Sequence, residues 1–254
     1  MRNHLKTIGV IPARYDSQRL PGKVLLKIGS RPMVHWVYER ARQSPLLSAV
    51  IVATDSDKVH QYCAEHDIPV MMTRQHPSGS DRLYEVLERT DGDVYVNIQG
   101  DEPTIRVDHI ELLLHPLLTG ACQVTTLKVA IDAATAQNPN VTKVITDNQN
   151  RALYFSRHPI PYDRENLNTQ QKEGSGSAGV HYYKHIGLYG YTRAALELFH
   201  SLPQSPLELA EKLEQLRYLE NGIPIYVAET PHDTVGVDTE ADLSLATELL
   251  MNDK

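Results

Sequence analysis

Short apolar runs alternate with longer helical patterns through the first half of the chain. The apolar runs cover residues 8–11, 49–54 and 95–99, and helical patterns cover 33–42 and 58–65 between them. In the first helical pattern the apolar side chains recur at helical spacing, which gives that helix one core-facing stripe. Strands that alternate with helices are typical of βαβ units. The sequence therefore predicts an α/β fold with a Rossmann-like, mostly parallel sheet flanked by helices.

From about residue 142 the pattern changes to shorter, hairpin-like strands. Strands are expected over 143–146 and 152–156, because the five residues between them are polar and include Asn and Asp, which favour a turn. We interpret this region, about residues 142–200, as an inserted β-rich lobe.

The last part of the chain returns to the pattern of the first half. A helix is expected over 207–220, a strand over 225–228 and a closing helix after residue 239. These elements complete one sheet, so we expect residues 1–254 to form a single domain.

Composition and charge restrict the partners. A chain of 254 residues with 41% hydrophobic side chains is long enough to bury a core. Its formal net charge of −7 gives no basic surface of the kind that binds nucleic acid or anionic lipid. We therefore expect neither nucleic acid nor a membrane as a partner, and any phosphate recognition has to come from a few placed cations.

The N-terminus and the cysteines bear on the compartment. The first residues lack the apolar core of a signal peptide, and no apolar run approaches the roughly 20 residues of a membrane span. Cys63 and Cys122 lie far apart and outside any Cys-x-x-Cys spacing, which indicates neither a disulfide framework nor a cysteine zinc site. We expect a cytoplasmic protein.

The loop after the first predicted strand carries three cations, Arg14, Arg19 and Lys23. An Arg side chain offers a planar fork of donors and a Lys a compact charge, so together they suit a triphosphate. A Walker P-loop does not explain this loop, because Gly22-Lys23 is followed by Val24 and no glycine precedes it at Walker spacing. Taken alone, the segment would be better explained as a solvated basic loop.

Two acidic residues follow strand patterns through a glycine. Asp101 lies in Gln-Gly-Asp-Glu-Pro at 99–103, and Asp238 lies in Gly-Val-Asp-Thr at 236–239. The carboxyl ends of parallel strands form the ligand crevice of an open α/β sheet, so these groups should converge. Two carboxylates suit Mg²⁺ when phosphate oxygens and water supply the other ligands. The alternative for Asp238 is a plain cap of the closing helix.

Small polar residues precede another helical pattern within segment 73–82, which holds Arg74 and Ser78. Backbone N–H groups at a helix N-terminus suit contacts to a base, a ribose or a phosphate. Ser80 in the same segment is equally an ordinary N-cap, so alone this signal is weak.

Taken together, these segments resemble the 3-deoxy-manno-octulosonate cytidylyltransferases. The cation loop alone indicates the broader sugar nucleotidyltransferase superfamily. Three stretches narrow the resemblance: Gln-Gly-Asp-Glu-Pro at 99–103, Ala-Leu-Tyr-Phe-Ser-Arg at 152–157 and Leu-Glu-Gln-Leu-Arg at 213–217. Matching stretches run in order from residue 11 to residue 239, so the resemblance covers almost the whole chain.

The resemblance implies an activity. The family couples CTP to the acidic sugar 3-deoxy-D-manno-octulosonate (Kdo) to give CMP-Kdo and pyrophosphate, for lipopolysaccharide or capsule biosynthesis. It also implies Mg²⁺ as cofactor and a homodimer, with the inserted lobe as the sugar-binding and contact surface.

The resemblance further implies roles for the positions that match. Arg14, Lys23, Asp101 and Asp238 would be catalytic, and the two aspartates would bind the metal. The residues expected around CTP are Pro12, Ala13, Arg14, Arg19, Lys23, Arg74, Ser78 and Gln99. Those expected around the sugar are Arg157, Arg164, His185, Tyr189, Glu214 and Gln215. An Arg fork suits the sugar carboxylate, and amide, imidazole and phenol groups suit its hydroxyls.

Several alternatives stay open at this point. His185 can instead be a packed core residue, and its spacing from His181 also permits zinc, although no matching Glu or Cys cluster accompanies the pair. The acceptor can be a nine-carbon sialic-acid-like sugar or the 8-amino form of Kdo, although Glu102 and Gly236 favour the unmodified sugar. From another class, a catalytically silent nucleotide-binding regulator would share the fold.

Overall fold

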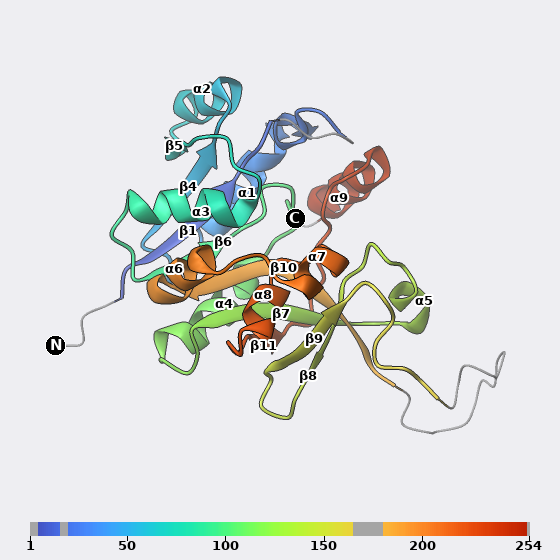
Figure 1. The fold of residues 1–254 in the computed structure, drawn as a ribbon. Coiled ribbons are helices and arrows are strands. Elements are labelled where there is room, and N and C mark those ends of the chain that lie inside the picture. Colours follow the sequence, from blue (N-terminus) through green and yellow to red (C-terminus); the bar gives the residue numbers. More distant parts are fainter. Residues whose placement is uncertain (1–4, 16–19, 165–179, 253–254) are drawn as a thin grey trace.

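A nine-stranded sheet forms the centre of the molecule (Figure 1). The structure is a computed structural model that describes residues 5–15, 20–164 and 180–252. Seven strands follow the order β11–β7–β10–β6–β1–β4–β5, and β8 and β9 extend the sheet beyond β10. Along this path of described strands, β10 alone runs antiparallel to both neighbours. The expected α/β fold with a mostly parallel sheet is confirmed.

The strands of the sheet have these bounds: β1 Thr7–Pro12, β4 Ala49–Thr54, β5 Val70–Met72, β6 Val94–Asn97, β7 Val124–Ile131, β8 Lys143–Thr146, β9 Ala152–Ser156, β10 Tyr182–Thr192 and β11 Tyr226–Glu229. A separate two-stranded sheet joins β2 (Lys27–Ile28) and β3 (Arg31–Pro32). The helices are η1 Lys23–Leu25, α1 Met33–Ala41, α2 Asp57–Glu65, α3 Gly79–Glu88, α4 Val107–Leu118, α5 Ala133–Ala136, α6 Arg193–Ser201, α7 Pro206–Glu211, α8 Leu216–Glu220 and α9 Glu240–Asn252. Not one of these helices combines the length and apolar character needed to cross a membrane.

Helices cover both faces of the sheet. Successive residues of a strand point to opposite faces, and in β1 Val10 belongs to one core cluster whereas Ile11 belongs to the other. The cluster around Ile11 takes its helical side chains from α1, α2 and α4, and the cluster around Val10 takes them from α3, α6 and α8. A sheet buried on both faces leaves its strand ends as the natural place for a ligand.

The region expected as an inserted lobe divides between the periphery and the main sheet. The β8–β9 hairpin projects at the end of the molecule away from α2 (Figure 1). By contrast, β10 pairs with β6 and β7 inside the central sheet, and α6 packs against α3. The pairing of β10 with β7 shifts register between Ile186 and Tyr189, around Gly187. Such an irregularity re-aims side chains, and here it lies beside the candidate site.

The single helix expected over 207–220 is two helices, α7 and α8. Lys212 ends α7 in the left-handed conformation, with φ 55°. Glu208 of α7 and Arg217 of α8 form a buried ion pair, with 2.8 Å between Nε and Oε2. This pair folds the two short helices against each other and leaves residues 212–215 as a turn at the cavity described below.

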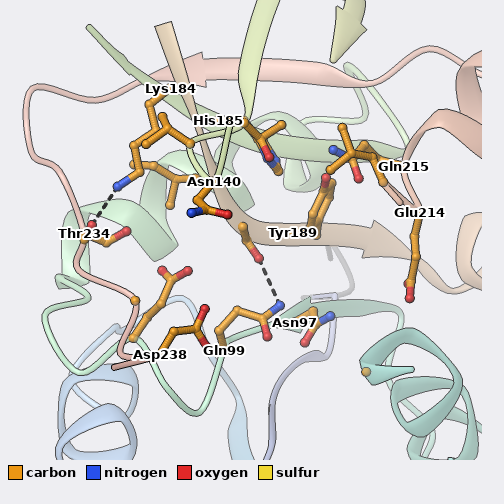
Figure 2. A pocket seen from close by; sticks show the side chains of 18 of the residues that line it. Asn97, Gln99, Asn140, Lys184, His185, Tyr189, Glu214, Gln215, Thr234 and Asp238 are labelled. Carbon is orange, nitrogen blue, oxygen red and sulfur yellow. Dashed lines mark hydrogen bonds between the residues drawn. The ribbon is translucent and has the colours of Figure 1, made fainter. Parts of the chain in front are cut away.

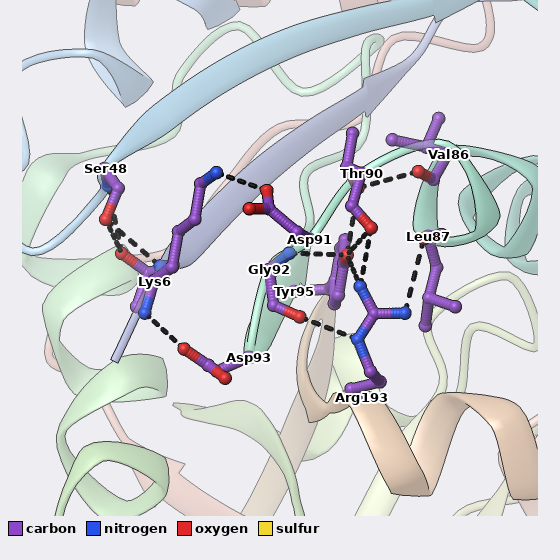
Figure 3. A network of polar contacts seen from close by, with 11 residues as sticks. Lys6, Ser48, Val86, Leu87, Thr90, Asp91, Gly92, Asp93, Tyr95 and Arg193 are labelled. Atoms are coloured by element: carbon purple, nitrogen blue, oxygen red, sulfur yellow. Dashed lines mark hydrogen bonds and ion pairs between the residues drawn. The ribbon is translucent and has the colours of Figure 1, made fainter. Parts of the chain in front are cut away.

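A polar network joins the two halves of the chain at the end of the sheet where β6 begins (Figure 3). Arg193, the first residue of α6, donates to the carbonyls of Gly92 (2.9 Å) and Thr90 (2.6 Å) and to the Tyr95 hydroxyl (2.8 Å). These bonds satisfy loop carbonyls between α3 and β6. The arrangement anchors α6 far from the strand ends that carry the candidate chemistry.

Candidate active site

Two adjoining cavities lie at the carboxyl ends of the strands. The larger, of about 820 Å³, is walled by β10, the α7–α8 turn and the loop before α9. The smaller, of about 260 Å³, is lined by Pro12, Arg14, Lys23, Val24, Gly79, Gln99 and Asp101. Gly79 and Gln99 line both cavities, so a molecule in one can touch a molecule in the other.

The loop after β1 is fastened to the end of β4. The Ala13 N–H donates to the Ala53 carbonyl (2.9 Å), and the Thr54 hydroxyl donates to the Ala13 carbonyl (2.7 Å). Gly22 adopts φ 68°, a left-handed conformation that glycine tolerates, and its N–H donates to the Tyr15 carbonyl (2.9 Å). This return of the chain brings Lys23 back to the site next to Arg14.

Arg14 is half-buried at the mouth of the smaller cavity. Its Nη1 donates to the Pro77 carbonyl at 3.1 Å, so the guanidinium bridges the β1 loop and the loop before α3. Burial and the neighbouring Arg82 both lower the pKa of Arg14. A second positive group close by makes this an environment that favours an anion.

Lys23 lies between the two predicted metal carboxylates. Its Nζ donates to Asp101 Oδ2 at 2.5 Å and to Asp238 Oδ1 at 2.9 Å. Burial alone would lower the pKa of Lys23, but the two carboxylates outweigh it and raise the pKa. The Val237 N–H donates to the Asp101 carbonyl at 2.8 Å, which joins the C-terminal loop to the loop after β6. The predicted convergence of the two aspartates is confirmed.

The pair of carboxylates is chemically suited to a divalent cation, and two protein ligands leave coordination positions open for other ligands. Carboxylate oxygens are the ligands that Mg²⁺ prefers, and the pair already shares one cationic group. No cluster of three or more His, Cys, Asp or Glu suitable for a metal occurs in the described part of the chain. A cation bound by this pair would need further ligands, which substrate oxygens and water can supply.

The larger cavity presents buried polar atoms that make no well-formed hydrogen bond inside the protein. Seven buried side-chain atoms of the described residues make no hydrogen bond of good geometry, and four of them belong to residues that line this cavity. These are Asn97 Oδ1, Glu102 Oε2, the Tyr189 hydroxyl and Gln215 Nε2. Figure 2 shows Asn97, Tyr189 and Gln215 around the cavity. Because unpaired buried polar atoms are costly, a mixture of donors and acceptors like this one is suited to a ligand with many hydroxyls.

His185 is a neutral group in the cavity wall. Its Nε2 lies 2.9 Å from Thr126 Oγ1, and its ring packs 5.0 Å from the Phe155 ring and 5.3 Å from the Tyr189 ring. Burial, with a smaller effect of Lys184, lowers the pKa of His185 to about 3. It can therefore position a hydroxyl but does not carry a charge near neutral pH.

The α7–α8 turn contacts the first turn of α3 in the wall of the larger cavity. The Ser80 hydroxyl donates to Glu214 Oε2 at 2.6 Å. Ser78, not Ser80, is the N-cap of α3, because its Oγ accepts from the Asp81 N–H at 3.1 Å. Ser78 lines neither of the two cavities.

Glu102 lies at the border between the carboxylate pair and the larger cavity. Burial, helped by Asp101, raises the pKa of Glu102 to about 7, although Lys184 opposes the shift. Its side chain packs beside Gly187 and Gly236: a Cβ at Gly187 would lie 3.5 Å from Glu102 Oε1, an ordinary van der Waals distance. The irregular region of β10 thus borders a buried carboxyl.

Other expected contacts lie outside the two cavities. Arg157 donates through Nε to the Glu211 carbonyl (2.8 Å) and through Nη1 to the Pro139 carbonyl (3.3 Å). Arg164 is exposed, and neither arginine lines either cavity. Arg74 is largely exposed, while its N–H donates to Glu85 at 3.0 Å. Arg19 lies outside the described residues.

A third cavity, of about 390 Å³, is lined by residues that lie close in sequence to Ala13 and Arg74. It is lined by Tyr15, Asp55, Ser56, Thr73 and Gln75, at the ends of β1, β4 and β5. Tyr15 of this cavity directly follows Arg14, which lines the smaller cavity.

Asn97, Asn140 and Lys184 are among the residues of the larger cavity to which sequence reasoning assigned no role. Asn97 is two residues before Gln99 in the same strand segment, so strand alternation could have placed it on the same side. Lys184 precedes His185, but strand alternation alone would place it on the opposite face. Nothing in the sequence pattern places Asn140 here.

Known proteins resemble this chain over nearly its whole length. Residues 8–227 match the cytidylyltransferase family. The 3-deoxy-manno-octulosonate cytidylyltransferase of Koribacter versatilis is 48% identical over 97% of this chain and 90% of that protein. The protein of the same name from Acidobacterium capsulatum is 48% identical over 98% of each chain.

Solved structures agree with these sequence matches. The structure of CMP:2-keto-3-deoxy-manno-octonic acid synthetase complexed with CTP has a TM-score of 0.90 and 43% identity, covering 98% of this chain and 100% of that one. A glucose-1-phosphate thymidylyltransferase from Bacillus anthracis has a TM-score of 0.66 at 16% identity, covering 98% of this chain and 96% of that one. This second similarity concerns the fold alone.

Proposed function

We propose a function that proceeds from one premise: the chain belongs to the cytidylyltransferase family and, within it, to the 3-deoxy-manno-octulosonate cytidylyltransferases. It transfers CMP from CTP to Kdo, forming CMP-Kdo and pyrophosphate. The observation that carries this proposal is the pairing of two adjoining cavities, one lined by cations and a carboxylate and the other by unpaired polar groups.

CTP occupies the smaller cavity in this proposal. Arg14 and Lys23 line that cavity and neutralise the triphosphate, with Arg19 of the same loop assigned by resemblance. The cytidine lies among the remaining residues of the expected set, which are Pro12, Ala13, Arg74, Ser78 and Gln99. Gln99 also lines the acceptor cavity, so it borders both substrates.

Asp101 and Asp238 would hold Mg²⁺, which would neutralise charge on the phosphate oxygens during transfer. Their present partner Lys23 can then bind phosphate instead. The fit rests on the nature of the donors, since both are carboxylates, one in the loop after β6 and the other in the loop before α9.

Kdo occupies the larger cavity, where His185, Tyr189, Glu214 and Gln215 contact its hydroxyls. The anomeric C2 hydroxyl attacks the α-phosphorus of CTP and loses its proton to water, and the bond between the α-phosphorus and the pyrophosphate oxygen breaks. Positioning of the two substrates and neutralisation of the leaving group by Arg14 and Lys23 supply the rate enhancement. Arg157 and Arg164 stay expected sugar contacts by resemblance, although both lie outside this cavity.

The experiment is pyrophosphate release in the presence of Mg²⁺. CTP, UTP, ATP and GTP are each paired with Kdo, 8-amino-Kdo and N-acetylneuraminate. Release with CTP and Kdo alone supports the proposal. Release with another sugar alone would assign a different acceptor, and no release with any pair would favour a nucleotide-binding regulator.

We also propose that the protein works as a homodimer in the cytoplasm. The family resemblance supports the dimer, and the use of a nucleoside triphosphate supports the compartment. Sedimentation velocity at micromolar concentration should give one species of twice the chain mass. A single species of the chain mass would refute the dimer.

A further inference from the structure

The charge of the larger cavity sets a requirement on its ligand. Five acidic residues line it, namely Glu102, Glu214, Asp233, Asp238 and Asp242. Among the described residues two lysines line it as well, Lys184 and Lys212, and His185 is uncharged near neutral pH. A carboxylate that enters such a cavity needs a cation at its binding point, because a buried unpaired anion is costly.

The chemistry of the acceptor fixes where that cation must be. In a 2-keto acid the C1 carboxylate is bonded to C2, the carbon whose hydroxyl attacks CTP. The carboxylate must therefore lie close to the reacting atoms, on the side of Asp101 and Asp238. A cation on the far side of the cavity cannot meet this requirement.

Lys184 is the lysine on the required side. Figure 2 shows Lys184 and Thr234 on the side of Asp238, whereas Glu214 and Gln215 lie across the cavity. The Lys184 charge also acts on the pKa of Glu102, the neighbour of Asp101. Lys212 precedes Glu214 in the α7–α8 turn and is exposed, so it belongs to the opposite side.

The Lys184 ammonium can donate one more hydrogen bond, to a ligand. It donates to Asp233 Oδ1 at 2.7 Å and to the Thr234 carbonyl at 2.9 Å. An ammonium has three N–H donors, so these two bonds leave one for a ligand. Its side chain is 21% exposed, which leaves the ammonium less hydrated than a surface lysine.

We propose that Lys184 binds the carboxylate of the acceptor sugar and thereby selects an acidic sugar. This inference rests on the proposed function, because it assigns a contact to the acceptor named there. It also gives the carboxylate a partner inside the cavity, which Arg157 and Arg164 do not line.

The test compares Kdo with its C1 methyl ester, which keeps the hydroxyls but removes the negative charge. The KM for Kdo and the inhibition constant of the ester are measured by pyrophosphate release at saturating CTP. In the wild type the acid should bind more tightly than the ester, by on the order of 10- to 100-fold, as expected for one charge-assisted contact. In Lys184→Met the KM for Kdo should rise by that factor and the preference for the acid should disappear, with the KM for CTP unchanged.

Three further variants make the result specific. Lys184→Arg keeps the charge and should retain the preference for the acid. Lys212→Met tests the other lysine of the cavity and should also retain it. Lys6→Met removes a lysine that pairs with Asp91 outside both cavities and should leave every constant as in the wild type.

Each failure has its own signature. If the wild type releases no pyrophosphate from CTP with Kdo, the proposed function itself is refuted. If the wild type is active and Lys184→Met still prefers the acid, or if Lys212→Met loses the preference, the assignment to Lys184 is refuted while the proposed function stands.

Discussion

At the scale of single residues, Lys23 is held where two carboxylates approach each other. The ammonium contacts both Asp101 and Asp238, and the burial of Lys23 strengthens this attraction. A triphosphate and a metal would compete for the same groups. The site therefore contains a cation and two anions that can change partners when substrate binds.

Replacing Asp101 by Asn should lower kcat/KM for pyrophosphate release. The expected loss of transition-state stabilisation is about 2 to 4 kcal/mol. The physical reason is the loss of one preorganised charge beside the phosphates. Folding should persist, because Lys23 keeps Asp238 as a partner. Asp91→Asn, at an exposed aspartate outside both cavities, is the matched control. Activity of Asp101→Asn within twofold of the wild type would contradict the role of Asp101.

Single residues also show where sequence reasoning succeeds and where it stops. Arg14, Lys23 and Asp101 could be placed because the carboxyl ends of parallel strands share one edge of a sheet. Arg157 could not, because its direction depends on the Glu211 and Pro139 carbonyls, which are remote in sequence. The role of Lys184 depends on a loop about fifty residues further along the chain, which no local pattern reveals.

At the scale of elements, α3 organises the loop that precedes it. Glu85 of α3 accepts from the Arg74 N–H at 3.0 Å and lies 2.6 Å from His76 Nε2. Burial alone would raise the pKa of Glu85, but the hydrogen bonds from His76 and Arg74 outweigh it and lower the pKa to about 2. The helix therefore fixes the loop that carries the expected cytidine contacts.

The depressed pKa of Glu85 predicts a contribution to acid stability. A lowered carboxyl pKa stabilises the folded state above the unfolded value near 4.5 and loses this effect as the pH falls toward 2. The shift corresponds to on the order of 3 kcal/mol. The stability advantage of the wild type over Glu85→Gln should thus shrink between pH 4.5 and 2. Urea unfolding at several pH values measures this stability difference, and Glu88→Gln, at an exposed glutamate, is the control. Parallel curves of stability against pH for the wild type and Glu85→Gln would contradict the prediction.

The loops after β1 and β6 touch through Gly100. A Cβ at this position would lie 2.7 Å from the Pro12 carbonyl oxygen, a backbone atom that cannot rotate away. Gly100→Ala should separate the two loops, lower the free energy of unfolding by about 1 to 3 kcal/mol and reduce kcat/KM. Thermal unfolding and pyrophosphate release measure the two effects.

Gly79→Ala is the matched control for Gly100→Ala in unfolding, because its added Cβ would meet only Pro12 Cγ, at 3.9 Å. Equal stability of Gly100→Ala and the wild type would show that the loops have more freedom than the close approach indicates.

The element pattern was predictable where each strand or helix has its own periodicity. The strands expected over 49–54, 143–146 and 152–156 have those bounds in the structure. The helix expected over 207–220 is broken, because the ion pair of Glu208 and Arg217 requires a turn between them. Helical periodicity continues through such a turn and so hides it.

At the scale of the whole molecule, segments from the first and last parts of the sequence meet beside the carboxylate pair. Val237 packs with Ile28 and Met33 of the N-terminal half and with Ala246 and Leu250 of α9. The next residue, Asp238, shares Lys23 with Asp101. Ligand binding at this point engages segments from the beginning, middle and end of the sequence, so it should stabilise the fold as a whole.

CTP should therefore raise the free energy of global unfolding by mass action. With Mg²⁺ and CTP at about 100 times its Kd the increase should be about 2.7 kcal/mol, and each further tenfold in concentration should add about 1.4 kcal/mol. Urea unfolding at a series of CTP concentrations measures this increment. In Lys23→Met the increment at the same CTP concentrations should fall, because one phosphate contact is lost and Kd rises. An increment equal to that of the wild type would mean that Lys23 does not bind the triphosphate, and the cation between the two aspartates would then serve the fold alone.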